Sequence, residues 1–533
     1  MAERAAGRDG RASGFAPWRR TMIVDPATVD QDVRLTTDVV VVGSGAGGAV
    51  VAHKLAQAGI GVVLLEEGPA LAPQDFTQRE EEMYPRLYRE HGTRATADYS
   101  VLVSQGRTLG GSSVASFCLC FRPREQTLAR WRQKARITLG TGDLAAHLDW
   151  LEGALSVSQV PADAPGTINR LVADGATELG WRGFRPRHSR VDCLGCGYCA
   201  LGCAYGRKRD LASTLIPAAS ALGATVVPSA LVEDLDHRDG MVRGVVATIT
   251  AGATPQSHRL SVDARLTILA AGAINSPRLW IKSKLPGVGG EVGRHLHLQP
   301  QVYVAGVFDQ PVDPWQGMPQ AYVVDEFLRL EEDPDGGFLI MPAVAHPVAI
   351  ASLLPGTGET HRDLMTGAQH LGLVSITLND RTSGRVDVDR RGQPVVTYHL
   401  VDEDQDALLE GLRRAADLLF VAGARRVVLP FNEPTVFDRR GEYKLLESRR
   451  IRSSDPLLLS FAPHGSLRMG LDRTTSVVGP LGEAHAVGRL FVSDASVLPG
   501  QAGLPPQLTV MALAARTGAH IVTRSEELGF RGA

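Results

Sequence analysis

Four cysteines stand close together at a spacing that suits metal chemistry. They are Cys193, Cys196, Cys199 and Cys203. The pattern C-x2-C-x2-C-x3-C matches the spacing with which ferredoxins ligate iron–sulfur clusters, although Ala204 stands where ferredoxins carry proline. In ferredoxins the fourth cysteine serves a second cluster, so Cys118 or Cys120 is a candidate to complete the ligand set. A zinc site, two disulfides or structural cysteines are the alternatives.

A glycine-rich turn near the start of the chain predicts a phosphate-binding loop. The turn, G-S-G-A-G-G at 43–48, follows an apolar run at 39–42 and precedes a predicted helix over 49–58. We expect Gly43 to make the tight turn, Gly45 to let the backbone approach a pyrophosphate, and Gly48 to let the helix pack closely. Glu66 ends the next predicted strand, at the position that binds a ribose hydroxyl. Together these features predict a dinucleotide site.

Two further segments add candidate contacts to this site. The segment 106–113 is rich in glycine, and consecutive glycines let backbone lie against a flat or anionic ligand. Its candidate cofactor-binding residues are Arg107, Gly110, Gly111 and Ser112. Near the C-terminus, a predicted strand ends in Asp494 and is followed by Ala495, which suits contact with a polyol chain.

These motifs, with Ala270–Pro277 and the segment 494–509, resemble those of the glucose-methanol-choline (GMC) family of FAD oxidoreductases. The resemblance runs from about residue 36 to residue 520. It implies FAD held by the glycine turn, Glu66, the segment 106–113 and the pair Asp494 and Ala495. It also implies an adenine contact from backbone near Val232, and it adds Ser116, where the family usually has asparagine, and Thr509 to the cofactor-binding set.

The family's catalytic positions are apolar in this chain. In the family a histidine acts as base on the substrate hydroxyl, and a later asparagine or histidine helps to hold that hydroxyl. Here these positions fall on Ala462 and Pro505. His464, two residues on, is therefore the candidate catalytic base, since an imidazole with a pKa near 7 suits removal of the hydroxyl proton. The alternatives are a structural histidine or a different flavin reaction.

The resemblance implies an FAD-dependent oxidoreductase that oxidises an alcohol by hydride transfer to flavin. The alternative is a GMC-fold flavoprotein with non-standard flavin chemistry or an electron-transfer role. The segment 114–123, followed by Trp131, is similar to the long-chain alcohol oxidase branch, which favours a lipophilic small-molecule alcohol. The uncharged stretch Phe338–Pro355 is either buried core or a lining for an apolar substrate. Oxygen, a quinone and a protein all remain open as electron acceptor.

The expected fold class is α/β plus α+β. A Rossmann-type FAD-binding domain would be assembled from the separated segments 36–300 and 455–525, and 301–454 would form a substrate domain based on an antiparallel sheet. Alternating runs at 385–388 and 395–400 predict antiparallel strands, and 404–421 predicts an amphipathic helix. Residues 1–35 would be a flexible tail.

Charge and composition exclude some partners. The 533 residues include 56 basic and 58 acidic side chains, so no net field attracts nucleic acid. No stretch is long and apolar enough to predict a transmembrane segment, and the pair Arg19-Arg20 lacks the apolar segment of an export signal. Because no export signal accompanies the cysteines, we expect a reducing, cytoplasmic location.

Overall fold

The computed structural model describes residues 23–250, 256–287, 289–433, 435–447, 449–452 and 454–530. Most of the predicted flexible tail, including Arg19-Arg20, lies outside these ranges. The tail does not extend to residue 35, because strand β1 begins at Val33 and pairs with β10. Val24 is also buried, and its backbone N–H donates to the carbonyl of Val226 at 2.9 Å.

The first sheet carries the glycine-rich turn. Its strands run in the order β7-β2-β1-β10-β9-β8, and β21 pairs with β10. The bounds are β1 Val33–Val42, β2 Val62–Leu65, β7 Thr225–Val227, β8 Ala230–Arg238, β9 Met241–Thr250, β10 Ser257–Leu269 and β21 Leu490–Val492. β7, β2, β1, β10 and β21 are parallel, whereas β9 and β8 are antiparallel additions. The last four residues of β1 and all of β2 are apolar and buried, which is typical of strands covered on both faces.

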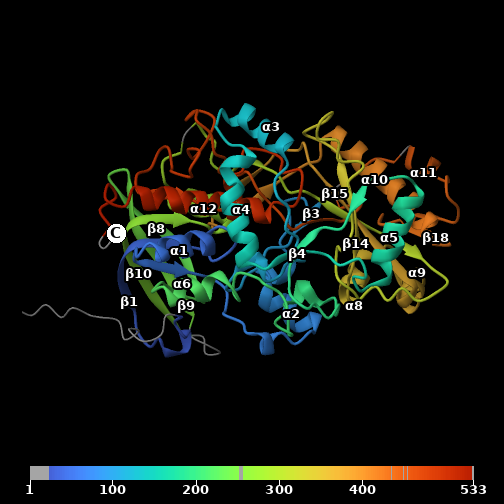
Figure 1. The fold of residues 1–533 in the computed structure, drawn as a ribbon, viewed down its shortest axis with the longest axis horizontal. Helices are drawn as coiled ribbons and strands as arrows, with labels where there is room; N and C mark the ends of the chain where they lie inside the picture. Colours follow the sequence, from blue (N-terminus) through green and yellow to red (C-terminus); the bar gives the residue numbers. More distant parts are fainter. Residues whose placement is uncertain are drawn as a thin grey trace, which may run out of the picture.

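Helices cover this sheet at one end of the elongated molecule (Figure 1). They are α1 Gly48–Gln57, α4 Thr141–Ala154, α6 Leu215–Ala221 and α12 Gln507–Thr523. α1 packs against both α6 and α12, and α12 packs against α4. The C-terminal helix therefore lies beside the first helix of the chain, so that the two distant segments form one domain.

A second, antiparallel sheet fills the other end of the molecule (Figure 1). Its order is β19-β18-β12-β15-β14-β13-β5, with β20 joining β12 to β3. The bounds are β3 Val101–Val103, β5 Gly183–Phe184, β12 Gln301–Val307, β13 Val323–Val324, β14 Phe338–Ala343, β15 Leu371–Leu378, β18 Arg426–Leu429, β19 Thr435–Phe437 and β20 Leu458–Ser460. Helices α5 Thr167–Glu178 and α10 Asp402–Val421 pack on its strands.

The local predictions for this half are largely confirmed. α10 matches the predicted helix, and β16 Gly384–Val388 and β17 Pro394–Thr397 form the predicted antiparallel pair. That pair does not join the large sheet, because β16 pairs instead with β11 Arg294–Leu296. The stretch Phe338–Pro355 forms β14, which is buried throughout, and α8 Pro347–Leu353, so its first part is core.

The α-helices and strands not yet given complete the fold. They are α2 Glu80–Leu87, α3 Glu125–Ala135, α7 Gly272–Lys282, α9 Gly358–Thr366, α11 Lys444–Glu447, β4 Val157–Gln159 and β6 Arg187–Ser189. β12 begins where the predicted substrate domain does. However, β3, β5 and β20 come from segments assigned to the FAD domain and pair in the second sheet. The two predicted regions therefore interleave in the structure.

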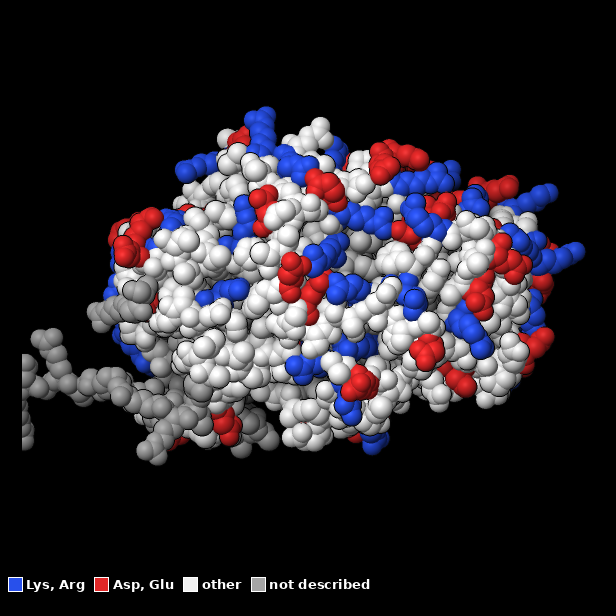
Figure 2. Space-filling model, viewed as in Figure 1, with Lys and Arg blue, Asp and Glu red and all other residues white. Residues whose placement is uncertain are grey.

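Acidic and basic side chains are interspersed over the face seen in Figure 2. This pattern agrees with the near-balanced composition. Among the described residues, no helix has both the length and the apolar character needed to cross a membrane.

Candidate functional site

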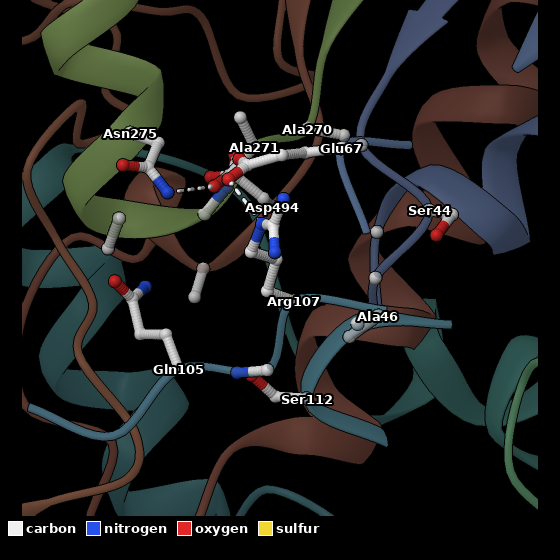
Figure 3. A pocket seen from close by; sticks show the side chains of 18 of the residues that line it. Ser44, Ala46, Glu67, Gln105, Arg107, Ser112, Ala270, Ala271, Asn275 and Asp494 are labelled. Atoms are coloured by element: carbon white, nitrogen blue, oxygen red, sulfur yellow. Dashed lines mark hydrogen bonds and ion pairs between the residues drawn. The ribbon is translucent and has the colours of Figure 1, made fainter. Parts of the chain in front are cut away.

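A large open cavity lies where strands of the first sheet end. Val42, Leu65 and Ala270 line it at the carboxyl ends of β1, β2 and β10, and Asp494 lines it just after β21. Ligands of open α/β sheets bind at this edge. Figure 3 shows side chains from several distant segments around the cavity.

The glycine turn forms one wall of the cavity and leads into α1. Gly43 adopts a φ of +100°, and a Cβ there would lie 2.4 Å from the carbonyl oxygen of Ala270. A Cβ on Gly48 would lie 1.8 Å from the carbonyl oxygen of Gly43, so the helix packs directly on the turn. Gly45 is different, because a Cβ there would meet no protein atom within 4 Å. The open side of Gly45 therefore leaves room for a phosphate at the N-terminus of α1.

Glu66 ties the glycine turn to the end of β2. Its carboxylate accepts hydrogen bonds from the backbone N–H of Ser44 at 3.0 Å, from the Ser44 hydroxyl at 2.6 Å and from the N–H of Gly68 at 2.9 Å. The Ser44 hydroxyl in turn accepts from the N–H of Gly110 at 2.9 Å. Burial raises the pKa of Glu66, and these bonds oppose that shift. The carboxylate oxygens keep lone pairs for a ribose hydroxyl.

Charged and amide side chains surround the middle of the cavity. Glu67 forms ion pairs with Arg89 and, at 3.0 Å, with Arg107. Behind them the buried Arg94 donates to the side-chain oxygen of Gln105 at 3.0 Å and to that of Asn275 at 3.2 Å. The Asn275 NH2 group donates to the carbonyl oxygen of Ala271 at 3.5 Å, and the Gln105 side chain lies at the cavity wall (Figure 3).

Asp494 fixes the start of α7 to the C-terminal segment. Its carboxylate accepts from Gly272 N–H at 2.8 Å, from the Ser276 hydroxyl at 2.5 Å and from Ser496 through both its N–H and its hydroxyl. Burial raises the pKa of Asp494, and the four hydrogen bonds oppose the rise. The carboxylate is thus a rigid part of the wall.

A second cavity adjoins the first. The two share wall residues, which are Gly106, Ser112, Phe461, Ala462, Pro506 and Gln507. The second cavity combines apolar side chains such as Phe117 and Leu119 with the amides of Gln299, Gln301 and Gln320. Among the described residues that line it, Tyr88 is the one titratable side chain, and its hydroxyl contacts the carbonyl oxygens of Ala115 and Ala200.

The structure places His464 behind the wall of these cavities, among neither set of lining residues. Its ring is 1 % exposed, Nδ1 bonds the carbonyl oxygen of Ala462 at 2.9 Å, and the ring stacks on His297 at 5.4 Å. Burial lowers the pKa of His464 to about 4, and the neighbouring His297 adds to this decrease. The hypothesis that His464 is the catalytic base therefore gains no support, because the imidazole neither reaches the cavity nor has a pKa near 7.

Comparison with known proteins gives the family. The sequence model of GMC oxidoreductases matches residues 84–301 with its N-terminal part and 380–514 with its C-terminal part, and an NAD(P)-binding Rossmann-like model matches 41–103. A GMC-type oxidoreductase of Mycobacterium tuberculosis is 34% identical over 484 residues, which cover 90% of this chain and 74% of the relative. The chain belongs to the GMC oxidoreductase family.

More distant relatives agree with this placement. The long-chain-alcohol oxidase FAO4A of Arabidopsis thaliana is 28% identical over 530 residues, covering 96% of this chain and 72% of the relative. A formate oxidase of Aspergillus oryzae superimposes with a TM-score of 0.69 at 18% identity, covering 94% of this chain and 100% of that structure. The predicted fold class and the resemblance to GMC oxidoreductases are confirmed.

Most of the predicted cofactor-binding residues line the first cavity of this GMC oxidoreductase. They are Gly43, Gly45, Glu66, Arg107, Gly111, Ser112, Val232, Asp494 and Ala495. Ser116 lines the second cavity instead. Gly48, Gly110 and Thr509 line neither. Gly48 and Gly110 act behind the wall, on helix packing and on Ser44, and Thr509 is buried within α12.

Sequence reasoning missed several residues of the site. Arg89 and Arg278 line the first cavity, as do the amides Gln105 and Asn275. No motif marks Arg89, Gln105 or Arg278 as a site residue, since the tertiary fold is what brings them to the cavity. Asn275 had the best local signal, because it lies in the motif 270–277 that supported the family resemblance.

The neutral, buried state of His464 predicts a loss of stability in acid. An exposed histidine in the unfolded chain has a pKa of about 6.5. Below that value the unfolded state binds more protons than the folded state, so stability is present above pH 6.5 and falls as the pH decreases towards 4. We expect urea denaturation to show a decrease of about 2 kcal/mol between pH 7 and pH 5 from this residue.

The matched variants are His464→Gln and His399→Gln. The first should remove about 2 kcal/mol from the decrease in the free energy of unfolding between pH 7 and pH 5. The second removes a histidine whose side chain is 70% exposed and pairs with Asp98 at 3.3 Å, so it measures what an exposed ion pair contributes and should have the smaller effect. An unchanged pH dependence in His464→Gln would contradict the assigned state of this imidazole.

Proposed function

We propose that this GMC oxidoreductase binds FAD and oxidises an alcohol, a CH–OH donor, by hydride transfer to the flavin. The two adjoining cavities suit a dinucleotide beside a small-molecule substrate. The glycine turn and the N-terminus of α1 would hold the pyrophosphate, Glu66 the ribose, and backbone near Val232 the adenine. The flavin supplies the hydride acceptor. The protein's own side chains would bind and orient the substrate.

Gln299 provides the observation that favours a hydroxyl-bearing substrate. It lines the second cavity, is 2% exposed, and its Oε1 atom is buried without a hydrogen-bond partner among the described residues. Its backbone has a φ of +49° and is held by a hydrogen bond from its N–H to Asp380 at 3.1 Å. A buried acceptor without a donor is costly. An alcohol hydroxyl would supply that donor, and the apolar wall suits a lipophilic remainder.

The hydroxyl proton has no histidine or carboxylate to receive it among the described lining residues. In the proposed reaction it therefore leaves to water or hydroxide. The same observation favours a second candidate function, in which the flavin carries out a reaction other than alcohol oxidation.

Anaerobic reduction of the bound flavin by a panel of alcohols tests the proposal. We expect primary alcohols with longer alkyl chains to bleach the flavin band, and the rate to rise with pH because no protein group acts as base. Gln299→Leu should raise the alcohol concentration that gives the half-maximal rate, by about 10-fold or more for a lost buried hydrogen bond. Gln126→Leu, whose amide bonds Glu331 at the surface, is the matched control.

Failure of every alcohol, with reduction by another class of hydride donor, would favour the second candidate. A rate that is independent of pH above about 5 would indicate a protein base instead. Reoxidation of the reduced protein by air, by a quinone or by a redox protein then identifies the electron acceptor.

A further inference from the structure

A third, small cavity is lined by the cysteine run. Five cysteines border it, which are Cys118, Cys193, Cys196, Cys199 and Cys203. All six cysteines of the chain lie in the described residues, and none forms a disulfide. The prediction of two disulfides therefore finds no support. The segment 193–203 closes around an open space, whereas structural cysteines usually fill a packed core.

The spacing of the cysteine side chains argues against a single metal ion. Within the described ranges, no three cysteine, histidine or carboxylate side chains are grouped closely enough to hold one metal. A zinc ion bound by thiolates requires four sulfurs at about 2.3 Å from one centre. The cysteines instead border one shared cavity, which suits a polynuclear group in which each metal takes its own thiolate.

Two buried cations face the same cavity. Arg190 and Lys208 are 6% and 4% exposed and both line it. The Lys208 ammonium donates to the carbonyl oxygens of Val114 at 2.5 Å and of Cys199 at 2.8 Å. Arg190 donates to the carbonyl of Phe117 and to Cys193 Sγ at 3.8 Å, while its Nε has no partner among the described residues.

The lining includes no carboxylate that could balance these cations. Arg207, also in the lining, pairs with Asp192 at 4.0 Å, and Asp210 lies near Lys208 outside the lining. Buried charges are costly unless they are paired. A group with net negative charge, bound by thiolates, would provide that pairing.

The shape of the cysteine loop is fixed by its neighbours. Gly197 has a φ of +81°, and a Cβ there would lie 2.3 Å from the carbonyl oxygen of Trp315. The backbone N–H of Arg207 donates to Cys203 Sγ at 3.3 Å. Hydrogen bonds of this kind to the sulfurs tune iron–sulfur clusters. The loop is thus held around the cavity by contacts outside the cysteines.

We infer that this cavity is an iron–sulfur site, with Cys193, Cys196, Cys199 and Cys203 as ligands and Arg190 and Lys208 as balancing charges. The site borders the two cavities described above. Ser112 and Ser113 line the first, 115–117 line the second, and Cys118 lines the third. The segment 112–118 therefore forms a common wall. The inference does not depend on alcohol oxidation.

Iron and acid-labile sulfide analysis of the full chain tests this site directly. After anaerobic purification and reconstitution with iron and sulfide, we expect about 2–4 of each per chain and a broad visible absorption beside the flavin bands. Cys196→Ser and Cys199→Ser should remove both, with flavin content and circular dichroism unchanged. Cys120→Ser is the matched control, because Cys120 is buried nearby but does not line the cavity.

The role of the cations is tested by Lys208→Met. Removal of a positive charge beside the cluster should lower its reduction potential, because the reduced cluster carries the greater negative charge.

Reconstituted wild-type protein with flavin but no iron would overturn the inference, as would zinc in place of iron. Retention of full iron content in both Cys196→Ser and Cys199→Ser would overturn the assignment of the ligands.

Discussion

Gly45→Val is expected to abolish FAD binding while the fold remains intact. A Cβ at this position meets no protein atom within 4 Å, so the valine side chain would occupy cavity space and not the core. The fingerprint places the pyrophosphate of the dinucleotide in that space. Flavin released on denaturation measures the outcome, and circular dichroism with a thermal melt reports the fold.

The chain offers a matched control for this substitution. Gly142 in α4 also has open space around its Cβ position, but it is exposed and lies outside both proposed ligand cavities. Gly142→Val should retain full flavin content. Glu66→Ala should lower flavin affinity by a smaller amount than Gly45→Val, because it removes hydrogen bonds without filling the site. Wild-type flavin content in Gly45→Val would refute the placement of the cofactor.

The glycine turn could be predicted from the sequence because its signals are local. Strand, turn, helix and strand follow one another within 39–66, although the close contact at Gly43 is with Ala270 from a distant segment. The second cavity could not be predicted in this way. Gln299, Gln320 and Tyr88 meet there only through the pairing of distant strands, and no local pattern encodes that meeting.

The interleaving of the two sheets had a similar cause. β3, β5 and β20 are short strands of two or three residues, and such segments carry little periodicity. Their partners lie far away in the chain, so the predicted boundaries at 300 and 455 follow the long segments and miss the short ones. The cysteine run, by contrast, has a clear sequence signal in its spacing. The cations that face it become visible only in the fold.

His464 shows why residue type alone did not identify the base. Its backbone pairs with His297 through hydrogen bonds of 2.8 and 2.9 Å, and this pairing holds the ring among buried neighbours. Asp380 lies close to His297 and bonds the N–H groups of Leu298 and Gln299. The imidazole therefore belongs to the structure that supports Gln299. The sequence places His464 two residues from Ala462, which lines both cavities. In the structure the His464 imidazole lines neither cavity.

Ala462→His, alone and with Pro505→Asn, is expected to increase flavin reduction by an alcohol. Ala462 lines both cavities and Pro505 lines the second, so these two positions still face the proposed substrate space. An imidazole there would supply the missing base, and general base catalysis contributes about 10²–10⁴-fold. Stopped-flow measurement of flavin reduction, over a range of pH, gives the rate and shows whether it becomes independent of pH above the new pKa.

His464→Ala tests whether His464 is the catalytic base or a structural residue. If His464 supports structure, flavin reduction at saturating alcohol should keep its rate and its pH dependence in this variant, and any loss should fall on alcohol binding through Gln299. A loss of about 10²–10⁴-fold with unchanged flavin content would instead make His464 the base, and would require the wall at 461–463 to open during turnover. Faster flavin reduction in Ala462→His, with no slower reduction in His464→Ala, would show that the family's catalytic geometry is retained. The side chains now at the two family positions would then simply lack the catalytic groups.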